Sequence, residues 1–166
     1  MVGKVEPLLQ ERAGALMASL CHLLRSPSFS FASADIPDRP GVYVICDVTG
    51  RPYYIGQSRN LRRRLLVDHR KGNGKSNVFR RKLARIKRFD SEPATTAYIM
   101  ENCTVRLLEI DSEWGRLEME HFATAILSPV LNAPAGWYNR AILLREVDQC
   151  SPNVSSPVLT STAAAL

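Results

Sequence analysis

The stretch GVYVICDVTGRPYYIG, residues 41–56, decides the fold of this chain of 166 residues. Its first half is rich in β-branched and aromatic residues, which is typical of a strand, and we predict that strand over residues 41–48. Thr49 and Gly50 give a turn signal, and residues 52–57 then return as a second strand. The stretch therefore predicts a β-hairpin.

The predicted hairpin carries a tyrosine on each arm. Because side chains alternate between the two faces of a strand, Tyr43 and Tyr54 fall on the same face. A turn centred on the Thr-Gly pair places Tyr43 opposite Gly56, whereas a turn centred one residue earlier places it directly opposite Tyr54. Two tyrosines on one face are usually packing partners, so the pair alone assigns no function.

An arginine-rich helix follows the hairpin. It is predicted to begin near Leu61, and its first turn holds Arg62, Arg63 and Arg64. The arginine guanidinium is a planar fork that matches phosphate oxygens. A phenol is a poor base at neutral pH because its pKa is about 10, and a nearby guanidinium or metal ion favours the phenolate. Tyrosines and arginines placed together are therefore suited to a phosphodiester.

The other segments are predicted from hydrophobic spacing and from breaker residues. An amphipathic helix and a proline-containing connector make up residues 1–38, and the main domain covers residues 39–148. Residues 149–166 are uncharged and rich in Ser, Pro and Ala, and we predict a disordered tail there. The N-terminal helix covers residues 5–24, and the later elements are helices over 78–89, 94–102 and 112–127 and a strand over 103–110.

Basic residues are concentrated in one part of the chain. The net charge is +6, and 13 of the 22 Lys and Arg residues lie between Arg59 and Arg88, where Asp68 is the single acid. Such a patch favours a polyanion, above all nucleic acid, although a charge run is also typical of a solvated helix face. The predicted DNA contacts are Arg62, Arg63, Arg70, Lys71, Lys75, Arg80, Arg81, Lys82 and Arg85.

Composition argues against several other classes of protein. No apolar run approaches the length of a membrane span, so no membrane partner is expected. The N-terminus does not read as a signal peptide. The four cysteines and three histidines form no zinc pattern, which favours free thiols in a reducing compartment. We therefore expect a protein of the cytoplasm, associated with the nucleoid when it is bound to DNA.

The motifs GVY (residues 41–43) and YIG (residues 54–56) resemble the two name-giving motifs of the GIY-YIG nuclease superfamily, with Val in place of Ile. That family has an arginine ten residues beyond the tyrosine of the second motif, and Arg64 stands there in this chain. A histidine often follows four residues after the arginine. Here His69 follows at five residues, which is a departure from the family pattern.

A later helix completes the resemblance. The family has a glutamate that is followed, about twelve residues on and after a proline, by an asparagine, and Glu120 and Asn132 match these positions. Five elements in order over residues 39–133 make the resemblance specific. It implies an α/β (α+β) fold with a small antiparallel three-stranded sheet flanked by helices, to which the N-terminal helix is added.

The resemblance also implies hydrolysis of DNA phosphodiester bonds with one divalent ion, Mg²⁺ or Mn²⁺. Glu120 would hold the ion through oxygen, and Arg64 would stabilise charge on the pentacovalent phosphorus. Either Tyr43 or Tyr54 activates or orients the attacking water, with Tyr43 favoured as the base. His69 either accepts a proton or hydrogen-bonds a phenol, or it is a surface histidine at a helix end.

Three further residues support the site in this interpretation. Gly41 and Gly56 belong to the two motifs, and the lack of a side chain at Gly56 lets another group approach the backbone closely. Asn132 is expected to tie its loop to the helix and to take no part in the chemistry.

Three functions of different classes follow from these features. An active endonuclease on double-stranded or branched DNA needs the complete set of Tyr43, Tyr54, Arg64 and Glu120. A catalytically inert DNA-binding module on the same fold would lack the arginine or the glutamate. An RNA-binding or protein-interaction domain, the least favoured, is supported only by the basic helices. Restriction by a homodimer and stand-alone repair both remain open as biological roles.

Overall fold

The computed structural model describes residues 5–133, and the predicted domain end at residue 148 and the predicted tail lie outside these residues. The elements are α1 (Val5–Arg25), β1 (Phe29–Ser30), β2 (Gly41–Asp47), β3 (Pro52–Ser58), α2 (Leu61–Arg63), the π-helical segment η2 (Arg64–His69), α3 (Val78–Lys87), α4 (Glu92–Asn102), β4 (Cys103–Glu109) and α5 (Glu113–Leu127). Within the described residues, no helix is both long and apolar enough to cross a membrane.

Four antiparallel strands form one sheet in the order β1-β4-β2-β3. The predicted class, an antiparallel sheet flanked by helices, is confirmed, but the sheet has one strand more than predicted. The additional strand β1 lies in the segment predicted as a connector and pairs with β4 through Phe29 and Val105. A strand of two residues shows no hydrophobic periodicity, so the sequence alone does not reveal it.

The hairpin register follows the first of the two predicted alternatives. Tyr43 pairs with Gly56 and Ile45 pairs with Tyr54, so the two tyrosines are diagonal neighbours on one face. The turn is closed by Asp47, whose Oδ1 accepts hydrogen bonds from the backbone N–H of Thr49 and of Arg51 at 2.8 and 3.0 Å. An Asp side chain that bonds the backbone in this way is a common turn former. The register shifts by one residue between Ile45 and Cys46, so the turn and this irregularity together set the pairing of the tyrosines.

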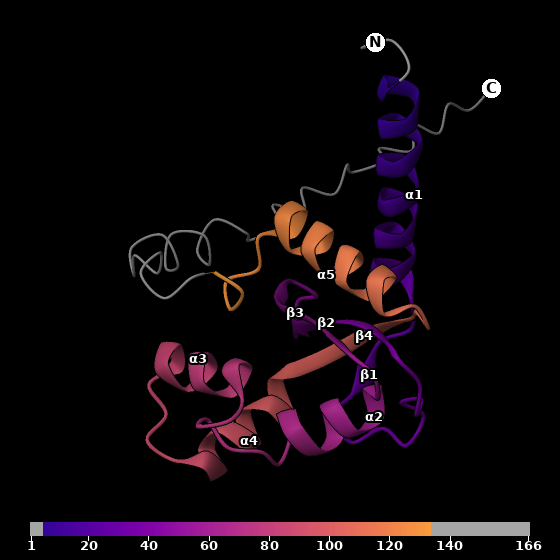
Figure 1. The fold of residues 1–166 in the computed structure, drawn as a ribbon. Helices are drawn as coiled ribbons and strands as arrows, with labels where there is room; N and C mark the ends of the chain where they lie inside the picture. The colour runs from indigo at the N-terminus through magenta and orange to yellow at the C-terminus, as the bar shows by residue number, and fades with distance from the viewer. Residues whose placement is uncertain (1–4, 134–166) are drawn as a thin grey trace, which may run out of the picture. The chain divides into compact units, whose positions relative to one another are not determined.

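Helices cover both faces of the sheet. Figure 1 shows α5 on one side, and α2, α3 and α4 on the other. Side chains of β2 alternate between these layers, as strand geometry requires. On the face toward α1 and α5 the buried residues include Val42, Val44, Cys46, Leu20, Leu23, Met119 and Ala123. On the opposite face they include Tyr43, Ile45, Leu61, Leu65, Phe79, Leu83, Ile99 and Val105.

The N-terminal helix α1 covers the core with its second half only. Leu20 and Leu23 are buried there. In contrast, the apolar residues Val5, Leu8 and Leu9 in the first half of the helix are 51%, 64% and 62% exposed. The amphipathic pattern of the sequence therefore predicts the helix correctly, although only part of its apolar stripe packs on the domain.

The π-helical segment η2 explains the departure from the family spacing at His69. A π-helix closes its hydrogen bonds over five residues instead of four, so the fifth residue takes the place that the fourth takes in an α-helix. The Arg70 N–H accordingly donates to the carbonyl of Leu65 at 3.0 Å. As a result, His69 follows Arg64 by one turn on the same side of the helix despite the additional residue.

The end of η2 is held by Arg80, a fully buried residue of α3. Its Nη1 donates to the carbonyls of His69 and Arg70 at 2.9 and 2.8 Å. Its Nε and Nη2 donate to the Glu92 carboxylate at 3.1 and 2.7 Å. The prediction that Arg80 contacts DNA is corrected by this burial, because every face of the guanidinium is occupied inside the domain. The residue is a structural anchor between η2 and α4.

Arg80→Met should destabilise the protein by about 2–4 kcal/mol, because buried carbonyls at the end of η2 would lose their donors. Arg85→Met is the matched control, since Arg85 lies on the same helix and is exposed. Its effect should stay within about 0.5 kcal/mol. Urea unfolding of both variants measures the difference, and equal stabilities would contradict the anchoring role.

Candidate active site

The two tyrosines, Arg64 and His69 converge on one side of the sheet. Tyr43 Oη lies 2.6 Å from His69 Nε2, and Arg64 Nε donates to the same oxygen at 3.3 Å. The ring centroids of Tyr43 and Tyr54 are 6.4 Å apart, and those of Tyr54 and His69 are 5.9 Å apart. Strands β2 and β3 supply the phenols, and η2 supplies Arg64 and His69. The alternative of a surface histidine is wrong, since His69 is fully buried.

Two glycines make the packing at the site possible. A Cβ atom built on Gly56 would lie 2.6 Å from Cζ of Tyr43, so the tyrosine ring occupies the space above the glycine. A Cβ on Gly41 would lie 2.8 Å from Cδ1 of Leu61, at the start of α2. Both distances are too short for a side chain. Because the glycine of each motif has no side chain, a neighbouring group can lie close to the hairpin backbone.

Burial and neighbouring charges raise the pKa of some groups at the site and lower the pKa of others. Burial raises the pKa of Tyr43 and of Tyr54, an effect that the charge of Arg64 partly offsets. Burial, together with the charge of Arg64, lowers the pKa of His69 to about 3. Both phenols and the imidazole are therefore neutral in the free protein at pH 7.

Glu120 on α5 is the candidate carboxylate of the site. Burial raises its pKa, and Arg64 is among the charges that oppose this shift. The Glu120 charge in turn raises the pKa of Tyr43 and Tyr54, which places the carboxylate within electrostatic range of both phenols. Among the described residues, no hydrogen bond or ion pair engages its oxygens. Helix α5 is fixed one turn earlier by buried Arg116, whose Nε donates to Gln57 Oε1 at 3.3 Å.

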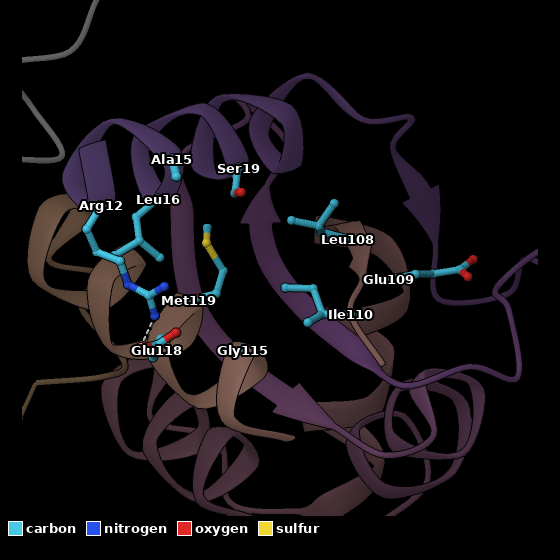
Figure 2. Close-up of a pocket in the computed structure, with 10 residues that line it drawn as sticks. All are labelled: Arg12, Ala15, Leu16, Ser19, Leu108, Glu109, Ile110, Gly115, Glu118 and Met119. Atoms are coloured by element: carbon cyan, nitrogen blue, oxygen red, sulfur yellow. Dashed lines mark hydrogen bonds and ion pairs between the residues drawn. The ribbon is translucent and has the colours of Figure 1, made fainter. Parts of the chain in front are cut away.

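The neighbouring carboxylate of Glu118 has different partners. It forms an ion pair with Arg12 of α1 and accepts a hydrogen bond from Trp114 Nε1 at 2.9 Å. Figure 2 shows this pair beside a cavity of about 320 Å³. The cavity is lined by Arg12, Ala15, Leu16, Ser19, Leu108, Glu109, Ile110, Gly115, Glu118 and Met119. None of these residues belongs to the tyrosine cluster, so the cavity is separate from the candidate site.

Asn132 fastens the loop after α5 to the sheet. Its Oδ1 accepts from the Ile55 N–H at 2.7 Å, and its Nδ2 donates to the Ile55 carbonyl at 2.8 Å. The Leu131 N–H adds a bond of 2.9 Å to the Tyr53 carbonyl. Strand β3 is the edge of the sheet, and these bonds satisfy its outer backbone groups on both sides of Tyr54. The tie therefore runs to the strand and not, as predicted, to the helix.

The predicted DNA contacts divide into two groups. Five of the nine side chains donate to backbone carbonyls of this domain: Arg62, Arg70, Arg80, Arg81 and Lys82. The other four are exposed: Arg63, Lys71, Lys75 and Arg85. Much of the basic charge therefore holds loops in place, and the exposed group is the better-supported part of the prediction.

Sequence reasoning missed the role of Asn77 at the site. The residue is recognisable as an N-cap, and it does accept from the Arg80 N–H at the start of α3. Its amide also lies beside His69, with Nδ2 2.9 Å from Nδ1 of the imidazole. The sequence carries no signal for this contact, because it depends on how the loop after η2 returns to the helix.

Comparison with known proteins agrees with the geometry. The model of the GIY-YIG catalytic domain family matches residues 39–107. This match confirms, over residues 39–107, the resemblance to the GIY-YIG family that the sequence shows.

The similar curated proteins share one name, UvrABC system protein C. The protein from Flavobacterium johnsoniae is 31% identical over 88 residues, which are 52% of this chain and 15% of that protein. The protein from Dictyoglomus thermophilum is 31% identical over 72 residues, 43% of this chain and 12% of that protein. The protein from Flavobacterium psychrophilum is 33% identical over 76 residues, 45% of this chain and 13% of that protein. The chain thus matches less than a sixth of each relative.

Among solved structures, the GIY-YIG N-terminal endonuclease domain of UvrC from Thermotoga maritima is similar. One point mutant of that domain, bound to its catalytic divalent cation, is 18% identical and covers 60% of this chain and 89% of that chain, with a TM-score of 0.37. A second point mutant is 17% identical, with the same coverage and TM-score.

Gly56→Ala should destabilise the protein by about 1–3 kcal/mol, because the added methyl group must displace the buried ring of Tyr43. Gly14→Ala is the control, since a Cβ on this glycine of α1 meets no atom within 4 Å. That change should stabilise the helix by about 0.5–1 kcal/mol. Thermal unfolding should therefore show shifts of opposite sign, and two shifts of the same sign would contradict the steric argument.

His69 should make folding stability depend on pH. The folded pKa lies near 3, whereas an unfolded histidine has a pKa of about 6.5. Below pH 6.5 the unfolded chain binds more protons, so stability should be lost progressively as the pH falls from 6.5 toward 3. Urea unfolding at pH 7 and pH 5 measures the loss, which should be smaller in His69→Phe than in the wild type. An equal loss in both proteins would show that another group is responsible.

Proposed function

We propose that this domain is a divalent-metal-dependent endonuclease that hydrolyses DNA phosphodiester bonds. The observation that carries the proposal is the convergence of Arg64 and the two phenols with the carboxylate of Glu120. A guanidinium suits a phosphate, a phenol suits a water molecule, and a carboxylate without a protein partner suits a hard cation. DNA repair is the role that the similarity to UvrABC system protein C favours, and cytoplasmic DNA is the substrate that we infer.

The donor set at Glu120 fits Mg²⁺ or Mn²⁺. Magnesium usually keeps several water ligands and binds through one or two carboxylates together with substrate phosphates. One carboxylate is what this site offers, since the described residues contain no group of three His, Cys, Asp or Glu side chains suited to a metal ion. When bound, the ion would neutralise charge on the phosphate and offset the Glu120 charge that raises the pKa of both tyrosines.

The two tyrosines differ in depth, and this difference suggests their roles. Tyr43 is fully buried, whereas Tyr54 is partly exposed. Since only Tyr54 of the two has solvent-exposed surface, we assign the contact with the attacking water to Tyr54. This assignment reverses the preference for Tyr43 as the base that the sequence suggested. Tyr43 instead accepts the bond from Arg64 Nε and thereby orients the guanidinium.

The reaction then balances as a single displacement on phosphorus. Because the Tyr54 phenol is neutral in the free protein, it first loses its own proton to solvent. The water oxygen then forms a bond to phosphorus, its proton passes to the Tyr54 phenolate, and the bond from phosphorus to the leaving oxygen breaks. Arg64 stabilises the negative charge that develops on the phosphoryl oxygens. The leaving oxygen takes a proton from solvent. Exposed Arg63, Lys71 and Lys75 supply attraction for the DNA backbone that does not depend on sequence.

Glu120→Gln should abolish nicking of supercoiled plasmid in Mg²⁺ or Mn²⁺ at low salt, with a loss of at least about a hundredfold. Glu118→Gln is the matched control, because that carboxylate lies two residues away and pairs with Arg12. It should cut within about twofold of the wild type. Anisotropy with a labelled duplex should show that both variants bind DNA.

Four results would contradict the proposal. Cleavage by Glu120→Gln at the wild-type rate would remove the carboxylate from the mechanism. Cleavage in excess chelator would remove the metal. Binding of duplex DNA without cleavage of plasmid or of branched DNA would support the inert binding module, and tighter binding of RNA than of DNA at fixed salt would point to an RNA partner.

A further inference from the structure

The orientation of the Asn77 side-chain amide is fixed by two backbone groups. Its Oδ1 accepts from the Arg80 N–H at 3.2 Å, as the N-cap of α3. Its Nδ2 donates to the Asp68 carbonyl at 2.6 Å. A flipped amide would place an oxygen against the carbonyl and a nitrogen against the N–H, so both bonds would be lost. The amide nitrogen is therefore the atom on the side of Asp68.

The fixed amide determines which nitrogen of His69 carries the proton. Asn77 Nδ2 lies 2.9 Å from His69 Nδ1, closer than Oδ1 at 3.2 Å. One hydrogen of Nδ2 is used by Asp68, and the second points to the imidazole. A proton on Nδ1 would oppose that hydrogen, so Nδ1 is an acceptor. Because the buried ring is neutral, its single proton sits on Nε2.

We propose that Asn77 is a positioning residue that holds His69 in the Nε2–H tautomer, so that the hydroxyl oxygen of Tyr43 accepts from both His69 and Arg64 and its own proton is turned away from them. With this tautomer His69 Nε2–H donates to Tyr43 Oη over 2.6 Å, and Arg64 Nε–H donates to the same oxygen. Both acceptor positions of the phenol are then filled. Its own O–H must then point away from both donors.

The opposite tautomer would have a different chemical consequence. If Nδ1 carried the proton, Nε2 would be an acceptor and would take the hydroxyl hydrogen of Tyr43. The Tyr43 oxygen, which orients the Arg64 guanidinium, would then receive one hydrogen bond fewer. The charged or titratable groups around the phenol are Arg64 from η2, Tyr54 from β3 and Glu120 from α5. None of them replaces the Asn77 contact with His69 Nδ1.

The test uses Asn77→Asp in the full chain, because Asp and Asn are equally good N-caps. An Asp side chain only accepts hydrogen bonds, so it should draw a proton onto His69 Nδ1. Long-range ¹H–¹⁵N spectra at pH 7 should show protonated Nε2 and unprotonated Nδ1 in the wild type, and protonated Nδ1 in the variant. Circular dichroism checks the fold, and Asn77→Ser, which keeps the cap without the amide donor, serves if Asp does not fold.

The spectra determine the tautomer without a cleavage assay, so this result does not depend on the proposed nuclease function. The catalytic role of Asn77 does rest on that proposed function. In the plasmid assay, Asn77→Asp should lower kcat at least about tenfold and leave KM within about twofold, because the DNA contacts are unchanged. A proton on Nδ1 of the wild-type His69 would overturn the proposal. A variant with the altered tautomer and the wild-type kcat would overturn it as well.

Discussion

The buried hydrogen bond between Tyr43 Oη and His69 Nε2 is the contact on which the site depends. It joins the central strand β2 to the helix that carries Arg64, and both partners are excluded from water. A buried polar pair is stabilising only when every donor and acceptor finds a partner, and each additional partner restricts the geometry further. Arg64 and Asn77 are those partners. A contact between two aromatic side chains is thereby extended into a network that spans β2, η2 and α3.

That network explains why the helix after the hairpin contains a π-helical segment. One residue more separates Arg64 from His69 than in the family pattern, and an α-helix would turn the imidazole away from the phenol. The wider turn restores the contact, and the bonds from Arg80 to the carbonyls of His69 and Arg70 hold the end of the segment. Such segments are frequent at functional sites. Here the π-helical segment accommodates the one additional residue between Arg64 and His69, because both side chains must face the hydroxyl oxygen of Tyr43.

The sequence predicts the fold well because its signals are local. The strand pattern, the turn signal and the helical spacing each depend on a few adjacent residues, and the predicted hairpin and helices appear in the structure. The convergence of Tyr43, Arg64 and Glu120 is predicted only through the family resemblance, because spacing alone does not bring α5 to the hairpin. Strand β1 and the Asn77 contact are not predictable, since each is defined by its distant partner and not by its own sequence.

The basic composition of the chain and the placement of its basic side chains in the fold indicate DNA-binding surfaces of different size. Thirteen basic residues between Arg59 and Arg88 suggest a wide electrostatic surface for DNA. In the fold, Arg80 is wholly buried, and Arg62, Arg70, Arg81 and Lys82 bind carbonyl groups of neighbouring loops. Arginine is suited to this second use because its five donors can hold several carbonyls at once. Arg62 and Arg81 stay exposed to solvent, whereas Arg70, Arg80 and Lys82 are partly or wholly buried. The length of the basic run therefore overstates the surface available to a phosphate backbone, and the salt dependence of DNA binding should follow the exposed side chains.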